Sequence, residues 1–337
     1  MTVPPLPTAA RSQGTALPEA PPPGGEASTF DGFSVIIPAL NEEPAIGLVL
    51  DRTHEVLTAH GRPYEIIVVD DGSTDGTGQV ASQRPGVRII RHPANAGYGA
   101  SLRDGVMAAQ YNWIVITDAD GTYPIEELPD LLRWAHEYDM VVGARTGAEY
   151  RGSLLKYPAR IAFGALCSFV TGMAIPDVNS GLRIMRRDLV VAFADTLSRG
   201  MSFTTTITLA MLSNGYFVKY VPISYHKRIG RSKVRYLRDT LRMAQIIVQA
   251  ITYYNPLKLF LVLAMLSVLL GLLGVAVGWL LGTAALWVTG AVYLAAALPL
   301  FGLGLIADLI RHQRERPLPP TLAQQALTRA QPTHERT

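Results

Sequence analysis

Trp113-Ile114-Val115-Ile116-Thr117-Asp118-Ala119-Asp120 is the stretch of sequence that decides the fold. Its apolar, β-branched start predicts a buried strand that delivers two carboxylates to the carboxyl edge of a parallel sheet, where open α/β sheets bind ligands. Because strand side chains alternate, Asp118 and Asp120 point the same way and can bind one hard divalent cation or the phosphates it carries. A solvated turn after a strand remains the simpler alternative for an isolated Asp-x-Asp.

The segments on either side repeat a pattern of strand, acidic or glycine-bearing turn, and helix. Strands are expected at 33–37, 65–69, 87–91, 140–143 and 218–223 in addition to the central one. Helices are expected from Asn41, after Thr77, up to Ala109, and at 125–137, 154–170 and 204–212. Such alternation predicts an α/β fold with a mostly parallel sheet.

The C-terminal third of the chain has the composition of a membrane segment. The 337-residue chain is 49% hydrophobic, which is high for a wholly soluble enzyme, and no charged residue occurs between Leu259 and Ala307. One membrane span needs about 20 residues, so this run predicts two transmembrane helices joined near Gly282. Lys and Arg crowd both outer flanks of this run. By the positive-inside rule the flanks and the α/β domain are expected on the cytoplasmic side of the cell (inner) membrane. A soluble helix pair is the alternative.

These patterns divide the chain into five parts. Residues 1–30 are rich in Pro, Ala and Gly, lack the apolar core of a signal peptide, and are expected to form a disordered tail. The α/β domain is expected to span residues 31–233. An amphipathic juxtamembrane helix follows at 234–256, and the hairpin occupies 257–310. Residues 311–337 are expected to form a disordered cytoplasmic tail.

Charge and cysteine content exclude several functions. A net charge of +3 does not suggest a nucleic-acid partner, and the single cysteine excludes an intrachain disulfide or a multi-cysteine metal site. Cys167 is expected to be a small buried hydrophobic residue. The turn after the first strand, residues 38–43, also lacks the Gly-x-Gly-x-x-Gly of a dinucleotide site.

Acidic groups at three successive strand ends instead suit a nucleotide ligand. Glu42 and Asp71 can accept hydrogen bonds from a base or a ribose, while Asp118 and Asp120 hold a metal on a diphosphate. Singly, each acidic turn is more often a helix cap. Together on one parallel sheet they favour a binding site.

Six stretches carry a resemblance to a known family: Val35–Glu43, Val68–Thr77, Asp118–Pro124, Val142–Arg145, Asn179–Arg183 and Arg228–Lys233. With them the chain resembles the family 2 glycosyltransferases of the GT-A fold, specifically the polyprenyl-phosphate branch that includes dolichol-phosphate mannose synthase. The resemblance covers roughly residues 33–235.

The resemblance implies roles for individual residues. Those expected in the nucleoside pocket are Pro38, Glu42, Asp70 and Asp71. Asp118 and Asp120 would serve the diphosphate and a Mg²⁺ or Mn²⁺ ion. The sugar-phosphate and acceptor-phosphate end would be served by Arg145, Ser180, Arg228, Ser232 and Lys233. Of all these, the residues expected to act in catalysis are Asp120, Arg145, Arg228 and Lys233.

The sequence departs from the family at one point, because Gly121-Thr122 stands where many relatives have Leu-Gln, which leaves the donor preference open. It also lacks the Gln-x-x-Arg-Trp element of processive polysaccharide synthases, so a long polymer product is not expected. The resemblance therefore implies an inverting transferase that moves one hexose, from a GDP-mannose or UDP-glucose type of donor, to undecaprenyl or dolichyl phosphate at the bilayer. Alternatives are transfer to a lipid or protein hydroxyl and a catalytically silent nucleotide-sugar-binding scaffold; a homo-oligomer is an open option.

Overall fold

The computed structural model describes residues 31–147, 157–229, 245, 248–249, 251–313 and 318–325. Seven strands form one sheet in the order β3-β2-β1-β4-β6-β5-β7. Their bounds are β1 Phe33–Ala39, β2 Tyr64–Asp70, β3 Val87–Arg91, β4 Trp113–Ile116, β5 Met140–Arg145, β6 Arg183–Arg186 and β7 Val218–Ile223. All pairings are parallel except those of β6, which runs antiparallel to β4 and β5. The predicted mostly parallel sheet is confirmed.

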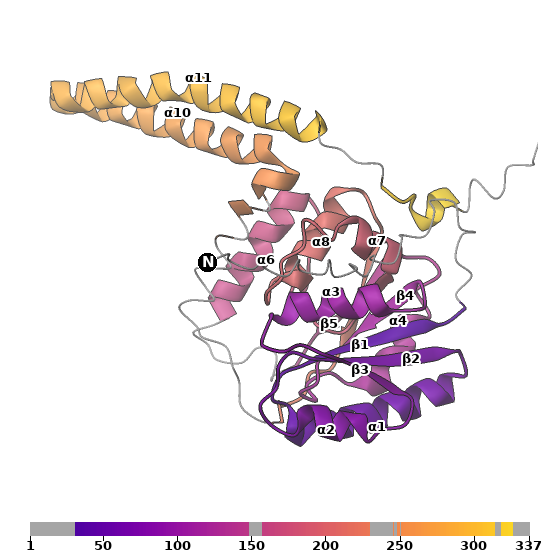
Figure 1. The fold of residues 1–337 in the computed structure, drawn as a ribbon. Coiled ribbons are helices and arrows are strands. Elements are labelled where there is room, and N and C mark those ends of the chain that lie inside the picture. Colours follow the sequence, from indigo (N-terminus) through magenta and orange to yellow (C-terminus); the bar gives the residue numbers. More distant parts are fainter. Residues whose placement is uncertain are drawn as a thin grey trace, which may run out of the picture.

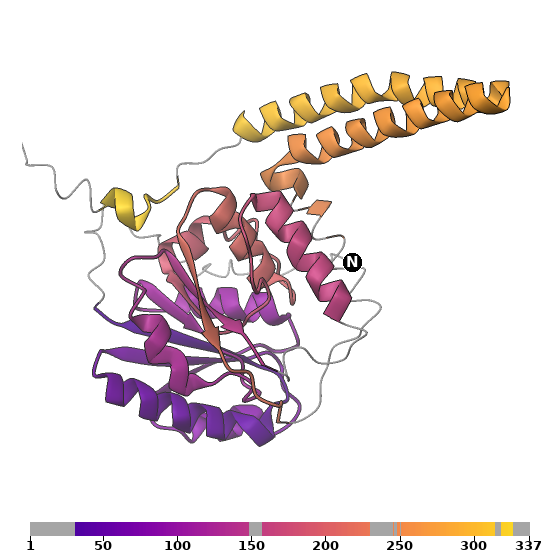
Figure 2. The ribbon, with the colours of Figure 1, turned by 180° about the vertical axis from the view of Figure 1, so that it is seen from behind.

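Helices cover both faces of this sheet (Figure 1). The first face carries α1 Glu43–His60, α2 Thr77–Ser82 and, after the 3₁₀ turn Ile125–Glu127, α4 Leu128–Leu132. The second face carries α3 Tyr98–Ala108, α6 Tyr157–Thr171, α7 Arg187–Ala192 and α8 Phe203–Ser213. Seen from behind, the helices α1 and α2 lie at the end of the molecule farthest from the C-terminal hairpin (Figure 2).

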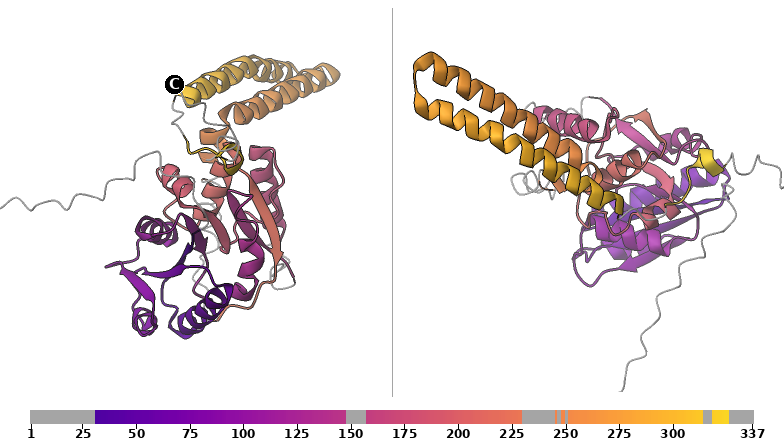
Figure 3. Two further views of the ribbon diagram at one scale, coloured as in Figure 1. Left: turned by 90° about the vertical axis from the view of Figure 1, so that its right-hand side faces the viewer. Right: turned by 90° about the horizontal axis from the view of Figure 1, so that it is seen from above.

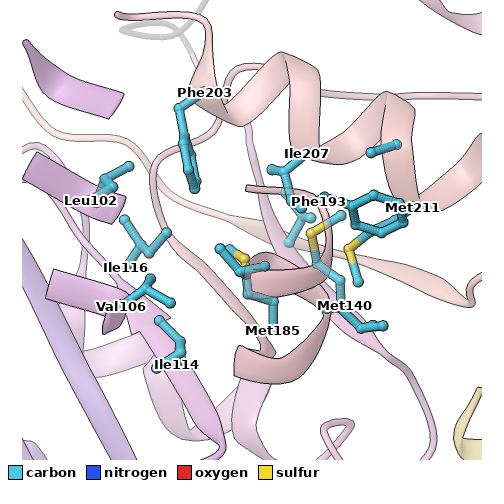
Figure 4. Close-up of a cluster of buried hydrophobic side chains, with 14 of the residues drawn as sticks. Leu102, Val106, Ile114, Ile116, Met140, Met185, Phe193, Phe203, Ile207 and Met211 are labelled. Atoms are coloured by element: carbon cyan, nitrogen blue, oxygen red, sulfur yellow. The ribbon is translucent and has the colours of Figure 1, made fainter. Parts of the chain in front are cut away.

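The period-two alternation of the strands builds two hydrophobic cores, one on each face. Val35 and Ile37 of β1 pack toward α1, whereas Ile36 between them packs toward α3. In the second core, side chains of β4, β5 and β6 such as Ile114, Met140 and Met185 meet α3 and α8 (Figure 4). This two-sided burial explains why the strands read as continuous apolar runs.

Three elements differ from the sequence-based expectation. The strand β6 and the helix α7 were not predicted, because β6 has only four residues and is buried on both faces, so it has no alternation to reveal it. The helix expected at 125–137 is shorter: after α4, residues 133–137 form turns with i to i+3 hydrogen bonds such as Trp134 N to Leu131 O. The remaining strands match to within two residues at each end.

Two long helices, α10 Pro256–Leu281 and α11 Ala284–Gln313, form the expected hairpin. In their most apolar windows 17% and 11% of the residues are buried, so the pair is not the core of a soluble protein. The helices approach closely because Gly271 and Gly274 face Gly290, and Gly278 faces the backbone of Trp287, where a Cβ atom would crowd the opposite helix. Figure 3 shows the pair extending well beyond the α/β domain. Both helices are long and apolar enough to cross a bilayer.

The terminal and juxtamembrane segments are described only in part. The tail at 1–30 lies outside the described residues, and so does most of the juxtamembrane segment, of which 245, 248–249 and 251–254 are helical. Within the tail expected to be disordered, the described residues are ordered: α11 continues to Gln313, and residues 318–325, which include the short yellow helix in Figure 1, pack on the α/β domain. The pattern missed this contact because its partners lie in β6 and in the turns before β5 and β7, far away in sequence.

Candidate active site

The central carboxylates lie where the sequence predicts them, directly after β4 at the carboxyl edge of the sheet. The Thr117 amide still pairs with Ile36 O of β1 at 3.3 Å, after which the chain leaves the sheet. Gly121 has φ of +72°, a backbone conformation that other residues adopt only with strain. That turn lets the amide and the hydroxyl of Thr122 both donate to Asp120 Oδ1, at 3.0 and 2.7 Å. The Gly-Thr pair that replaces Leu-Gln thus holds the Asp120 carboxylate in place.

Asp118 has a partner that the sequence analysis did not identify. The Tyr98 hydroxyl, at the start of α3, donates to Asp118 Oδ1 at 2.9 Å. Burial and, to a smaller extent, repulsion from the Asp120 charge raise the pKa of Asp118 to about 7. The signal for Tyr98 was its place in the loop after β3, which ends at the same edge of the sheet.

Arg228 joins the first and last parts of the α/β domain. Its guanidinium pairs with Glu42 Oε1, and its Nη1 atom lies 3.3 Å from Asp120 Oδ2. The loop that carries it is fixed by backbone hydrogen bonds from His226 N to Thr122 O at 2.9 Å and from Ile229 N to Asp120 O at 3.1 Å. A basic residue after β7 therefore supplies positive charge to the carboxylates after β4.

Arg145 is the last residue of β5, which ends near the carboxylates. Its Nε and Nη2 atoms donate to the two oxygens of Asp177 at 2.7 and 2.9 Å, a bidentate pair. The Arg145 charge is close enough to Asp118 to oppose the rise in that pKa. Ser180 is fully buried and donates to Gly143 O at 2.5 Å, so its hydroxyl fixes the loop after Asp177.

The residues expected in the nucleoside pocket divide into two groups. Pro38 is buried in β1, and Glu42 lies beside Arg228. Asp70 and Asp71 mainly hold backbone: Asp70 Oδ1 accepts from Ser73 N, and Asp71 accepts from the amides of Ala96 and Gly97 at 2.8 and 2.9 Å. In the structure Asp71 therefore orders the loop that carries Tyr98.

Ser232 and Lys233 lie outside the described residues, so their expected roles stay predictions. The structure brings Glu42, Asp118, Asp120, Arg145 and Arg228 together at one edge of the sheet. Besides Tyr98, it adds Tyr123, whose hydroxyl accepts from Gly181 N at 2.5 Å and so links the Asp120 loop to the Ser180 loop.

The donor set suits a divalent cation that is shared with a substrate. Among the residues that the structure describes, no three His, Cys, Asp or Glu side chains form a metal cluster. Two carboxylates whose charges repel one another attract a hard cation, and Mg²⁺ is commonly held by one or two carboxylates plus substrate phosphates. The Asp118 and Asp120 pair fits that kind of site.

Comparison with known proteins agrees with this geometry. The family model described as glycosyl transferase family 2 matches residues 34–192. The chain is 37% identical over 209 residues to the dolichyl-phosphate hexose transferase of Haloferax volcanii, covering 61% of this chain and 88% of that protein. It is 31% identical to the polyprenol monophosphomannose synthase of Mycolicibacterium smegmatis, covering 59% of this chain and 80% of that protein.

A solved structure shares the fold. Glucosyl-3-phosphoglycerate synthase from Mycobacterium tuberculosis, in complex with Mn²⁺, UDP and glucosyl-3-phosphoglycerate, superposes with a TM-score of 0.51 at 22% identity, covering 66% of this chain and 78% of that chain. The expected GT-A type of fold is therefore confirmed.

Proposed function

The chain belongs to glycosyl transferase family 2, and from this premise we propose that it is a membrane-bound inverting transferase that moves one hexose from a nucleotide sugar to a polyprenyl phosphate. The relatives named for dolichyl-phosphate hexose transfer and polyprenol monophosphomannose synthesis support this acceptor. The hairpin of α10 and α11 supports a lipid-linked substrate.

The state of Asp177 is the observation that carries the proposal. A hydroxyl acceptor must lose a proton as it attacks, which calls for a free carboxylate or imidazole as general base. Asp177 Oδ2 accepts from the amide and Nε of Arg145, and Oδ1 accepts from Arg145 Nη2 and Asn179 N. A carboxylate has about four acceptor positions, and these four donors occupy them, so Asp177 has no oxygen lone pair left to receive a proton from an acceptor hydroxyl. The site therefore suits an acceptor that arrives already deprotonated.

A phosphate monoester is such an acceptor. Its second pKa is near 6, by analogy with phosphorylated side chains, so it is largely a dianion at neutral pH. It needs positive charge and donors to place one oxygen in line with the anomeric carbon. Arg145 and Arg228 would supply that charge, and the expected roles of Ser232 and Lys233, which follow Arg228 in the sequence outside the described residues, add to it.

The same edge of the sheet suits the donor. Asp118 and Asp120 would hold Mg²⁺ or Mn²⁺ on the donor diphosphate, and the metal would stabilise the charge of the leaving nucleoside diphosphate. Tyr98 and Thr122 keep the two carboxylates oriented for this task. An acceptor oxygen then forms the bond to the anomeric carbon while the bond to the donor phosphate oxygen breaks, and the nucleoside diphosphate leaves with the electron pair.

We further propose that the protein spans the bilayer twice with the α/β domain in the cytoplasm. The basic flanks of the hairpin support this orientation. Contacts at both bases of the hairpin also support it: Tyr254 donates to Thr196 ahead of α10, and Tyr216 donates to Pro319 beyond α11. These contacts require both ends of the hairpin to lie on the same side of the membrane as the α/β domain. Two membrane spans meet that requirement.

A direct assay tests the function. The purified chain is incubated with a panel of radiolabelled nucleotide sugars and either polyprenyl phosphate or the matching free prenol. We expect labelled polyprenyl-phosphate sugar and release of nucleoside diphosphate with the phosphate only. Transfer to free prenol at an equal rate would contradict the phosphate acceptor, and no release with any acceptor would support a silent scaffold.

A further inference from the structure

The segment Leu318–Gln325, which we call the clasp, binds the α/β domain at the amino edge of the sheet, opposite the candidate active site. Three hydrogen bonds hold it: Tyr216 Oη to Pro319 O at 2.5 Å, Arg186 Nη1 to Pro320 O at 2.8 Å, and Leu322 N to Asp139 Oδ1 at 3.0 Å. Asp139 and Arg186 flank the amino end of β5 and the start of α7, and Tyr216 precedes β7.

On the side of the α/β domain these contacts are made by buried groups. The Arg186 and Asp139 side chains are 1% and 0% exposed and form an ion pair at 2.9 Å. The Pro320 carbonyl therefore accepts from a charged group that has little access to water, and an unmet buried donor of that kind is costly. Leu318 packs against the core on the α3 side of the sheet, and Leu322 packs against the core on the α1 side. The clasp thus contacts both cores across the edge of the sheet.

The clasp also has a defined conformation of its own. Thr321 N donates to Gln324 Oε1 at 2.9 Å, and Gln324 N donates to Thr321 Oγ1 at 3.1 Å. This reciprocal pair is a capping box, which fixes the first turn of a helix. A free tail has no need of such a cap, whereas a segment that docks in one orientation does.

The position of the clasp in the chain ties the end of α11 to the domain. Only residues 314–317 separate Gln313 from Leu318, and a connection of that length spans at most about 18 Å. The base of α10 is attached separately, since Lys258 Nζ bonds to Phe169 O of α6 and lies 4.5 Å from the Phe169 ring. The hairpin is therefore held at two places, one at each base.

We propose that the clasp fixes the orientation of the catalytic domain relative to the membrane hairpin. A domain joined to a membrane anchor at one place can swing about that joint, whereas two attachments remove most of that freedom. Because the clasp occupies the amino edge of the sheet, it leaves the carboxyl edge with Asp118 and Asp120 open to substrates. A fixed orientation keeps that edge at a constant height above the bilayer and raises the effective concentration of a membrane-embedded acceptor.

The test compares three chains in bilayers: the full chain, a chain that ends at residue 325 and keeps the clasp, and a chain that ends at residue 317 and lacks it. Each carries spin labels on cysteines at Met107 of α3 and Leu272 of α10, which are 50% and 57% exposed. We expect one narrow distance distribution for the full chain and the 325-residue chain, and a broad one for the 317-residue chain. An equally narrow distribution in all three would overturn the proposal.

A point variant and a second readout guard against misfolding. Leu322→Asp places a charge against the apolar core and beside Asp139, so it should broaden the distribution in the full-length chain while nucleoside-diphosphate binding stays unchanged. With polyprenyl phosphate in bilayers, turnover of the 317-residue chain should fall about tenfold, while turnover of a short-chain phosphate in detergent is retained. The turnover readout rests on the proposed function, but the distance readout does not. A broadened distribution with unchanged bilayer turnover would overturn the role of orientation in the reaction.

Discussion

Replacing Arg228 with alanine is expected to strengthen the binding of Mn²⁺ to the protein in the absence of any nucleotide. Arg228 Nη1 lies 3.3 Å from Asp120 Oδ2, and the same guanidinium pairs with Glu42. A cation that binds Asp120 must displace this positive charge or share the carboxylate with it. Removing Arg228 frees Asp120 and increases the negative charge of the site.

The size of the effect follows from the exposure of the pair. The Arg228 side chain is 29% exposed and that of Asp120 is 10% exposed, so water screens part of the attraction. Exposed ion pairs contribute up to about 1 kcal/mol and hydrogen bonds to charged groups about 1.5 to 3 kcal/mol, and this partly exposed ion pair lies between these two classes. About 1.4 kcal/mol corresponds to a tenfold change in affinity. The Mn²⁺ dissociation constant of Arg228→Ala should therefore fall about tenfold.

The assay is Mn²⁺ titration followed by electron paramagnetic resonance of the free ion, with purified protein in detergent. Lys227→Ala is the matched control, because it removes the same charge from the adjacent, exposed position. We expect its Mn²⁺ affinity to stay within about twofold of the wild type, because exposed charges are strongly screened. Arg228→Lys, which keeps the charge but loses the planar fork, should lie between the two.

The same variant should transfer sugar poorly. Without Arg228 the acceptor phosphate loses one of its cationic partners, so the apparent KM for polyprenyl phosphate should rise or kcat should fall while donor binding is nearly intact. Tighter Mn²⁺ binding with weaker turnover is an unusual combination that simple misfolding does not produce. An Arg228→Ala protein that binds Mn²⁺ no better than Lys227→Ala would refute the reasoning.

Three further predictions concern the metal, the topology and the hairpin. Asp120→Asn should raise the activation free energy for kcat/KM by about 3 kcal/mol, which lowers kcat/KM about a hundredfold, because the metal on the donor diphosphate loses a carboxylate ligand. Full activity of this variant in excess chelator would exclude the metal role. Cysteines placed at Thr283 and at Ala323 should react with a membrane-impermeant maleimide from opposite sides of sealed cells, and labelling of both from one side would contradict two spans. Labelling of the native Cys167 should be low in this experiment, because burial raises the pKa of its thiol to about 12 and almost no thiolate exists at neutral pH. Labelling of Cys167 should appear only on unfolding. A chain that ends at residue 256 should still bind nucleoside diphosphate, because the residues of both hydrophobic cores lie almost wholly before the hairpin. It should use long-chain polyprenyl phosphate poorly. Unchanged turnover with long acceptors in bilayers would count against a role for the hairpin.

Much of the fold follows from local patterns. The apolar runs at 33–37, 65–69 and 113–116 predicted strands because side-chain burial on both faces leaves no polar position in a central strand. The place of Asp118 and Asp120 at the carboxyl edge followed from their position directly after such a run. The hairpin followed from an uncharged stretch that no soluble domain of this size would expose.

The sequence also contained the residues of the site, but not the pairs that they form. Glu42 and Arg228 are separated by 186 positions and meet only because the loop after β7 folds back over the loop after β4. Asp177 looks like a free acid in the sequence, and its pairing with Arg145 depends on the loop before β6 lying beside the end of β5.

The sequence by itself determined most of the helices and strands, the two-carboxylate edge and the apolar hairpin, because each depends on residues that are close together along the chain. The tertiary structure alone decided that β6 runs antiparallel, that Tyr98 orients Asp118, and that the C-terminal clasp returns to Arg186 and Asp139. These features depend on which distant segments become neighbours when the two cores are buried. A local pattern carries no information about such neighbours, because the free energy that selects them comes from burial over the whole domain.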